Sequence, residues 1–133
     1  NRHRHVVGET LPLWPLCFHD VTFLTRYSTG GTSGGKPVRQ LENFLWGYMS
    51  YWPVNIVSQW KTWEREFKES LAVDSFHARI GADKMTDHRF LTPDGLVERT
   101  EFASGVAVTA NFAGEPVVVN GMEIGPQQCR IED

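Results

Sequence analysis

Residues 106–112 read Val-Ala-Val-Thr-Ala-Asn-Phe, and this stretch decides the fold because its pairing pattern follows from residue type alone. Apolar side chains stand at every second position from Val106 to Phe112. A period of two is typical of a β-strand that has one buried face and one wetter face. We therefore expect a half-buried strand here.

Turn-forming residues divide the surrounding chain into hairpins. Pro93-Asp94-Gly95 and Ser104-Gly105 bound a second strand-like stretch, residues 96–102. Glycine at these points accepts a positive φ, as tight turns require. Downstream, Asn120-Gly121 separates two short apolar triplets, and this dipeptide suits the type I′ turn that joins twisted strands. The C-terminal third is therefore predicted to be an antiparallel β meander.

The composition is that of an ordinary globular domain. The chain has 133 residues, of which 41% are hydrophobic and 22% charged, and this length suits one domain with its own core. The formal charge of -3 and the scattered Lys and Arg residues argue against nucleic acid and an anionic membrane as partners. No apolar run approaches the roughly 20 residues that span a bilayer, and the first residues lack the apolar core of a signal peptide. Because the chain begins with Asn1, we expect a processed product or a part of a longer polypeptide.

The cysteines and the Gly- and Ser-rich segment do not match the spacing of known metal-binding or phosphate-binding motifs. Cys17 and Cys129 lie far apart and show no C-x-x-C pattern, so two buried thiols are expected instead of a disulfide or a zinc site. The Gly- and Ser-rich residues 28–36 fail as a phosphate-binding loop because Pro37 follows where such a loop has Ser or Thr. We predict no metal and no cofactor, and a mobile loop at residues 28–36.

Residues 11–25 form a near-continuous apolar run that is broken by two prolines and then by the polar step His19-Asp20. Continuous apolarity over a short span is typical of a strand covered on both faces, so we place a buried strand at about Leu16 to Val21. The end of such a strand is where α/β barrels carry binding and catalytic groups, which makes His19 and Asp20 candidate substrate-binding residues. The alternative is that they mark the exit of the strand into water or hydrogen-bond to each other. Spacing alone favours neither interpretation.

Two aromatic-rich helices are predicted before Gly81. The first begins at Pro37, where the missing N–H of proline costs nothing, and ends near Pro53. The second begins there and runs to Ile80. Each carries an apolar stripe at helical spacing that we expect to be buried: Val38, Leu41, Leu45, Tyr48 and Trp52 in the first, and Ile56, Trp60, Trp63, Phe67 and Leu71 in the second.

Most aromatic and acidic side chains of these helices are explained by packing and by solvent. Aromatic rings stack on sugars, but rings at helical spacing are more often core. Trp46 and Tyr51 lie off the main stripes, and Trp46 is therefore a third candidate for substrate binding. Glycoside hydrolysis needs two carboxylates across a bond, whereas the acids between Glu64 and Glu69 stand among Lys and Arg as surface ion-pair partners do. Asp20 is the only carboxylate in a context that suggests a pocket, and no catalytic residue is assigned.

Two parts of the chain resemble a known enzyme family. The segment Leu13-Trp14-Pro15-Leu16-Cys17-Phe18-His19-Asp20 resembles the strand near the end of the (β/α)8 catalytic barrel in bacterial glycoside hydrolases related to endo-α-N-acetylgalactosaminidases. Residues 85–95 and 100–112 look like the passage from those barrels into the β-sandwich that follows. The similarity spans most of Leu11 to Phe112 and departs at Cys17, where the family often has an aliphatic residue.

The resemblance implies the tail of a barrel followed by a β-sandwich. The expected fold class is α+β: one buried strand, two or three aromatic-rich helices and an antiparallel β meander, with the barrel end at residues 1–82 and the β domain at 83–133. It implies a carbohydrate substrate, with His19 and Asp20 facing the mouth of the active site. A complete barrel needs about 250 residues, so the family's nucleophile and acid/base carboxylates would lie in a missing upstream segment of the same polypeptide. That segment is the expected partner, the chain alone is expected to be inactive, and secretion or periplasmic export is usual for such hydrolases.

Two competing hypotheses remain. One is a stand-alone α+β module that holds a glycan without cleaving it, through the β meander or through exposed aromatic rings. The other is a structural or interaction domain whose aromatic helices form an interface. Finding about 250 barrel residues encoded upstream of Asn1 would favour the hydrolase over both.

Overall fold

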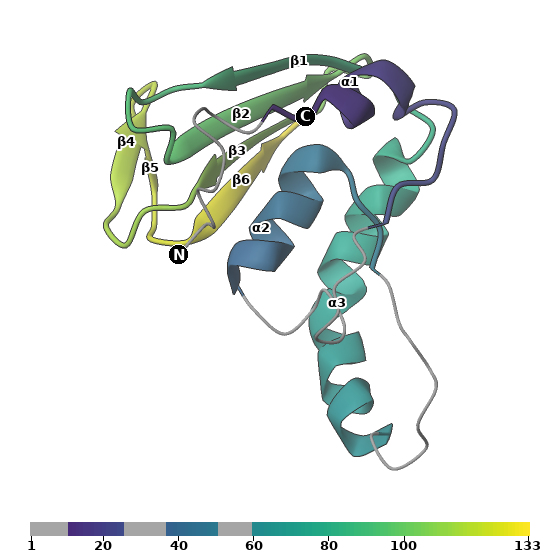
Figure 1. The fold of residues 1–133 in the computed structure, drawn as a ribbon. Helices are drawn as coiled ribbons and strands as arrows, with labels where there is room; N and C mark the ends of the chain where they lie inside the picture. Colours follow the sequence, from purple (N-terminus) through teal and green to yellow (C-terminus); the bar gives the residue numbers. More distant parts are fainter. Residues whose placement is uncertain (1–10, 26–36, 51–59) are drawn as a thin grey trace.

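The computed structural model describes residues 11–25, 37–50 and 60–133. They form helices and antiparallel strands in an α+β arrangement, which confirms the predicted fold class (Figure 1). The elements in chain order are α1 (Leu13–Phe18), α2 (Pro37–Trp46), α3 (Trp60–Ile80), β1 (Met85–Phe90), β2 (Val97–Phe102), β3 (Ala107–Asn111), β4 (Val117–Val119), β5 (Met122–Ile124) and β6 (Gln128–Glu132).

The antiparallel sheet contains the strands predicted at residues 96–102 and 106–112, but β3 is buried on both faces, so the prediction of a half-buried strand is wrong. β1, β2 and β3 pair in sequence, and Thr100 of β2 lies opposite Val108 of β3. β4 and β5 form a separate hairpin, in which Asn120 (φ 52°) and Gly121 (φ 77°) have the positive φ values of the predicted type I′ turn. The chain then returns, and β6 pairs with β3 to give the strand order β1-β2-β3-β6. β6 was not predicted, because only two of its five residues are apolar.

Helix α1 replaces the buried strand predicted at Leu16 to Val21, and that prediction is wrong. The backbone N–H of His19 donates to the Pro15 carbonyl at 3.0 Å and closes a helical turn. Pro12 and Pro15 stand before and within the first turn, where the N–H that proline lacks has no intrahelical acceptor. A short apolar run cannot be assigned to strand or helix from its period alone, which is why the sequence misled here.

Helix α2 begins at Pro37, as predicted, but ends at Trp46 instead of near Pro53. Gly47 follows with φ +66°, the left-handed conformation that closes many helices. The backbone N–H of Tyr48 then donates to the Asn43 carbonyl at 3.0 Å and satisfies one of the last carbonyls of the helix.

Helix α3 ends at Ile80, as predicted, but turns a different face to the core. Phe67 and Leu71, which were predicted to be buried, are about half exposed. The N-terminal half of α3 extends away from the sheet (Figure 1). The buried face belongs to the second half and consists of Ser70, Val73, Phe76, His77 and Ile80.

One apolar core joins the helices to the sheet. α2 contacts α3 and strands β2, β3 and β6, while α1 contacts β1. The rings of Phe76 on α3 and Phe102 on β2 meet edge to face, with centroids 6.4 Å apart. The core thus takes residues from both sides of the predicted division at residue 82, and that division stays a prediction. Its members are Leu41, Leu45, Trp46, Phe76, Ile80, Met85, Phe102, Val106, Val108, Ala110 and Phe112.

Some predictions fall outside the described part of the chain. They concern the mobile loop, the start of the second helix at Pro53, and side chains of both apolar stripes: residues 28–36, Val38, Tyr51, Trp52, Ile56, Trp60 and Trp63. None of the helices within residues 11–25, 37–50 and 60–133 is both long enough and apolar enough to cross a membrane.

Candidate functional site

His19 is a buried side chain that joins three parts of the fold. It caps the C-terminal end of α1 and is 3% exposed. Its Nδ1 lies 2.6 Å from the carbonyl oxygen of Asp83, in the turn between α3 and β1. Its Nε2 lies 3.3 Å from the carbonyl oxygen of Gly47, directly after α2. We call His19, Gly47 and Asp83 the histidine clasp.

The histidine clasp occupies both nitrogens of the ring. A neutral imidazole has one N–H and donates to one carbonyl, whereas an imidazolium donates to two. The shorter contact, to Asp83, points to Nδ1–H as the donor of the neutral form. His19 therefore fixes the chain at the end of α1, and its nitrogens face backbone carbonyls instead of solvent.

Gly47 leaves the space that the His19 ring fills. A Cβ atom built on Gly47 would lie 2.0 Å from Nε2 of His19 and 2.9 Å from Cδ1 of Ile80. Its φ of +66° is also a conformation that L-residues rarely adopt. The close approach and the left-handed backbone both require glycine at this position.

A second histidine and a carboxylate lie near the clasp. Burial lowers the pKa of His77, the nearby His19 lowers it further, and Asp74 raises it. Asp74 also accepts hydrogen bonds from the backbone N–H of Ser50 (3.2 Å) and from the hydroxyl of Ser70 (3.1 Å). These polar groups tie α3 to the segment after α2, and burial favours the neutral form of His77.

Asp20 follows His19 directly, and its side chain is exposed. The backbone N–H of Val21 donates to the Phe18 carbonyl at 3.2 Å, so Asp20 stands within a turn closed onto the end of α1. An ionised carboxylate offers two acceptor oxygens, which suits the hydroxyl groups of a sugar. Of the three predicted binding residues, Asp20 is the one whose side chain meets solvent.

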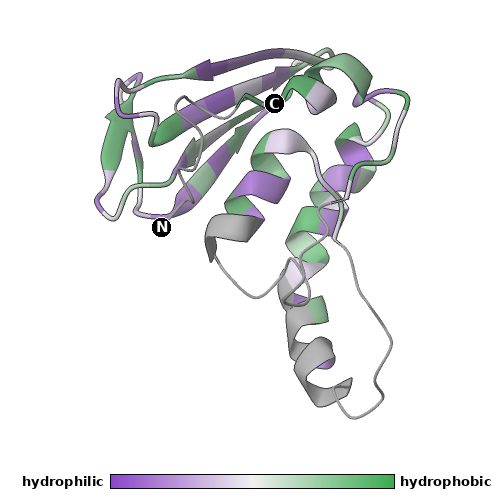
Figure 2. Cartoon of the chain, viewed as in Figure 1, coloured by the Kyte–Doolittle hydropathy of each residue, from purple (hydrophilic) through white to green (hydrophobic). Residues whose placement is uncertain are grey.

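Exposed apolar residues precede and follow this turn in the chain. Their large side chains are between 40% and 77% exposed, and we call them the apolar wall: Leu13, Trp14, Phe18, Val21 and Phe23. Hydrophobic residues lie on α1 and on the segment after it (Figure 2). Trp14 and Phe18 lie one helical turn apart on α1, with ring centroids 4.5 Å apart. Cys17 is exposed on the same helix as a free thiol, so the prediction that both thiols are buried is wrong for this one. Sequence reasoning did not select Trp14 or Phe18, although their spacing of four residues would place them on one face of a helix.

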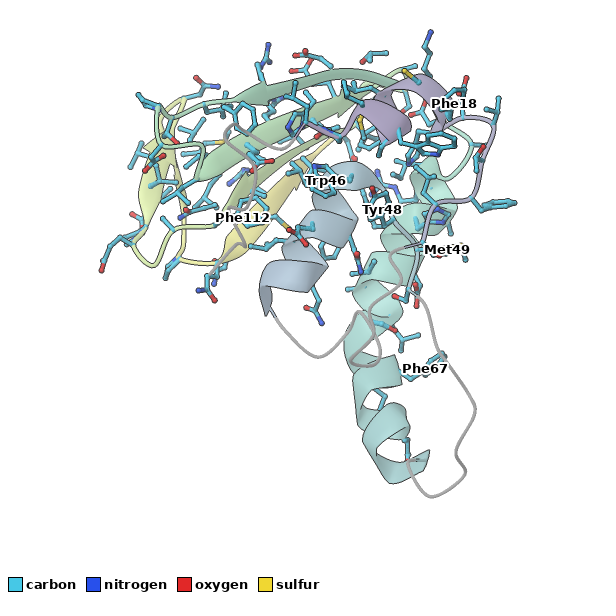
Figure 3. The ribbon with its side chains drawn as sticks, viewed as in Figure 1. Phe18, Trp46, Tyr48, Met49, Phe67 and Phe112 are labelled. Atoms are coloured by element: carbon cyan, nitrogen blue, oxygen red, sulfur yellow. The ribbon has the colours of Figure 1, made fainter. Side chains whose placement is uncertain are left out.

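Trp46, the third predicted binding residue, lies in the core. Its side chain packs edge to face on Tyr48, with centroids 5.7 Å apart, and the residue is 7% exposed (Figure 3). Its Nε1 is buried without a hydrogen-bond partner among the described residues. The structure therefore does not bring the side chains of His19, Asp20 and Trp46 to one exposed surface, and sugar contacts from His19 and Trp46 stay predictions for a larger assembly.

A buried acid on β2 was missed by the sequence analysis. Glu98 is fully buried, and its Oε2 lies 3.5 Å from Nε2 of His88. The Nδ1 of His88 lies 3.0 Å from the hydroxyl of Thr100. The signal was the strand alternation, which puts Glu98 and Thr100 on the same face as the core residue Phe102. Across the described residues, no three His, Cys, Asp or Glu side chains gather as a metal site requires.

The opposite face of the sheet carries a charged network. Arg99 donates to Glu101 (2.9 Å) and to the hydroxyl of Thr109 (2.9 Å), and it also pairs with Glu132. The hydrogen bond from Arg99 lowers the pKa of Glu101. The network joins β2, β3 and β6 on this face of the sheet, where Val97 and Ala107 are also buried.

Comparison with known proteins places this fold within a larger enzyme. No family model matches the chain, and no curated protein sequence matches it either. Solved structures of the alpha-N-acetylgalactosaminidase NagBb from Bifidobacterium bifidum do match. The ligand-free structure is 25% identical, with a TM-score of 0.56, over 79% of this chain and 16% of that chain. The GalNAc complex is 22% identical, with a TM-score of 0.55, over 89% of this chain and 18% of that chain.

The quadruple mutant of the same enzyme gives the same result, at 23% identity and a TM-score of 0.58 over 91% of this chain and 18% of that one. This chain is therefore similar in fold to one part of a glycoside hydrolase. It spans less than a fifth of the length of the structures that it matches.

Proposed function

We propose that this chain is the C-terminal portion of a carbohydrate-active glycoside hydrolase, supplying one wall of the substrate pocket and a supporting β domain. The observation that carries the proposal is the asymmetry of the structural match. It covers 79% to 91% of this chain but only 16% to 18% of the NagBb chain. The substrate class proposed from that enzyme is an α-linked N-acetylgalactosaminide.

In this proposal Asp20 contacts the sugar, and the histidine clasp holds it in place. The exposed carboxylate accepts hydrogen bonds from sugar hydroxyls, while His19 fixes the preceding backbone through Asp83 and Gly47. Such a rigid support matters because catalysis is sensitive to displacements of about 1 Å in a positioned group. Trp46 supports the same region from the core.

The catalytic carboxylate pair is proposed to lie outside this chain. Glycosidases hold two carboxyl groups about 5 to 9.5 Å apart across the scissile bond. Glu98, the buried acid on β2, is close to His88 and lies on the core face of the sheet. It is a structural group in this proposal, and the isolated chain is inactive.

The experiment compares the 133-residue chain with the product of its complete gene, using p-nitrophenyl α-N-acetylgalactosaminide as substrate. The complete product should release p-nitrophenol, and the isolated chain should not. Asp20→Asn in the complete product should raise KM about tenfold or more, as expected for a lost charged hydrogen bond, with unchanged thermal unfolding. Glu115→Gln changes another exposed acid and should leave KM unchanged. Turnover by the isolated chain, or equal KM values for Asp20→Asn and wild type, would refute this account.

A stand-alone glycan-binding module is the second candidate, and the exposed Trp14–Phe18 ring pair favours it. An exposed aromatic surface beside a carboxylate can hold a sugar without cleaving it. Titration of the isolated chain with N-acetylgalactosamine, followed by tryptophan fluorescence, separates the two. Saturable binding that Trp14→Ala abolishes would support the module.

A further inference from the structure

The apolar wall on α1 and the segment after it differs from other exposed apolar surface of the described chain. Five large apolar side chains fall within eleven consecutive residues, from Leu13 to Phe23. Between Leu11 and Phe18 the sequence has no charged residue. Elsewhere the exposed large apolar side chains, such as Val118 and Ile131, stand singly or in pairs, as is normal on a monomer.

The wall is also held firmly to the rest of the fold. α1 contacts β1, and the histidine clasp ties its C-terminal end to α2 and to the turn before β1. The surface is therefore presented by a fixed element. A fixed apolar patch with polar surroundings is typical of an interaction site.

From these observations we infer that the apolar wall is the surface on which the remainder of the same enzyme's catalytic domain packs. The inference rests on the proposed function and names the contact that it requires. Two observations select this occupant. The matched enzyme has more than four fifths of its chain outside the region of likeness, which provides a body of the required size. On the face of the sheet that carries Arg99, Val97 and Ala107 are already buried, whereas the side chains of the wall are exposed, so the contact is expected on the side of α1.

The position of Asp20 links this contact to the proposed substrate site. In the sequence Asp20 lies between Phe18 and Val21, two members of the wall, so its carboxylate would lie at the interface between this chain and the remainder of the catalytic domain. Binding sites occur preferentially at such borders. Packing against the wall would thus complete the pocket around the proposed sugar contact.

The experiment uses the polypeptide encoded directly upstream of Asn1 as a separate purified chain and measures its binding to the 133-residue chain by calorimetry. The two should form a one-to-one complex. Val21→Asp should weaken the complex at least about tenfold, because a charge is placed in an apolar contact. The matched control is Val118→Asp on β4, at the other end of the molecule (Figure 1). Val21 is 72% exposed and Val118 is 67% exposed, so both variants should keep the fold, and the control should bind within about twofold of wild type.

Three results would overturn the inference. They are equal binding by the two variants, no complex with the upstream chain, and dimerisation of the isolated chain that Val21→Asp abolishes while the upstream chain does not bind. Hydrolysis by the complete gene product together with equal binding would leave the proposed function standing and remove only the surface. If Val21→Asp alone lost binding but the complete gene product cleaved no glycoside, the contact surface would stand and the proposed function would be refuted.

Discussion

Replacing Gly47 with alanine tests whether the histidine clasp stabilises the fold. The new Cβ would lie 2.0 Å from Nε2 of His19, which is too close for any real contact, at a backbone φ of +66°. A left-handed backbone costs an L-residue about 1–2 kcal/mol. Inserting a carbon into a filled site costs about 1–3 kcal/mol. The free energy of unfolding should therefore fall by about 2–5 kcal/mol in Gly47→Ala.

Two other glycines separate these two costs. Gly105 has φ +95° and nothing within 4 Å of its built Cβ, so Gly105→Ala should lose only about 1–2 kcal/mol. Gly114 also has open space and no left-handed φ, so Gly114→Ala should change stability by less than about 1 kcal/mol. Urea unfolding followed by tryptophan fluorescence gives the three values, provided that the m-values agree.

Removing the ring tests the steric cost directly. In a His19→Ala background, Gly47→Ala should cost less than it does in wild type, because the His19 ring is gone and only the contact with Cδ1 of Ile80, at 2.9 Å, remains. The double-mutant cycle should then show a coupling of about 1–3 kcal/mol between residues 19 and 47. Additive effects, or a Gly47→Ala loss no larger than that of Gly105→Ala, would refute the clasp.

Three further predictions concern titration, reactivity and hydrogen bonding. Burial and then the nearby His19 lower the pKa of His77, so the unfolded chain binds a proton more readily. Stability should be full above pH 6.5, the ordinary value, and fall as the pH drops below it; a stability profile of His77→Gln as steep as that of wild type would contradict this. Burial raises the pKa of the Cys129 thiol to about 11, so an alkylating reagent at pH 8 should modify the exposed Cys17 far faster than it modifies Cys129. Equal modification rates of the two cysteines would contradict this prediction. The Asn111 amide donates to three backbone carbonyls that hold the β4–β5 hairpin, so Asn111→Asp should lower the unfolding free energy by about 1–3 kcal/mol; an unchanged urea midpoint would rule this out.

The sheet was predictable because its signals are local. Alternation between Val106 and Phe112, and turn residues such as Asn120-Gly121, act within a few positions and need no distant partner. β6 has no such local signal, because it pairs with β3, which lies about twenty residues earlier in the chain. The apolar stripe of α3 was misplaced for a related reason. Helical spacing showed which residues share a face, but not that the side chains of Phe67 and Leu71 would be about half exposed.

The contacts of the candidate site could not be predicted. The His-Asp step was singled out because it interrupts an apolar run, and the structure places it at the end of α1, while its role in sugar binding stays a prediction. The partners of His19 are the backbone carbonyls of Gly47 and Asp83. Every residue has a backbone carbonyl, so the residue types in the sequence could not indicate these partners. The separation of a buried His19 from an exposed Asp20 therefore came only from the structure.

The strand order has a consequence for how isolated copies of this chain behave at high concentration. Among the described strands, β1 and β6 border the sheet, and border strands can pair with strands of other molecules and form fibrils. Both borders carry charges: Asp87 and Arg89 on β1, and Arg130 and Glu132 on β6. A strand added at either border would bury part of these charged side chains, which costs free energy, so pairing between the borders of two molecules is discouraged. The sheet thus carries its own protection against ribbon-like aggregation.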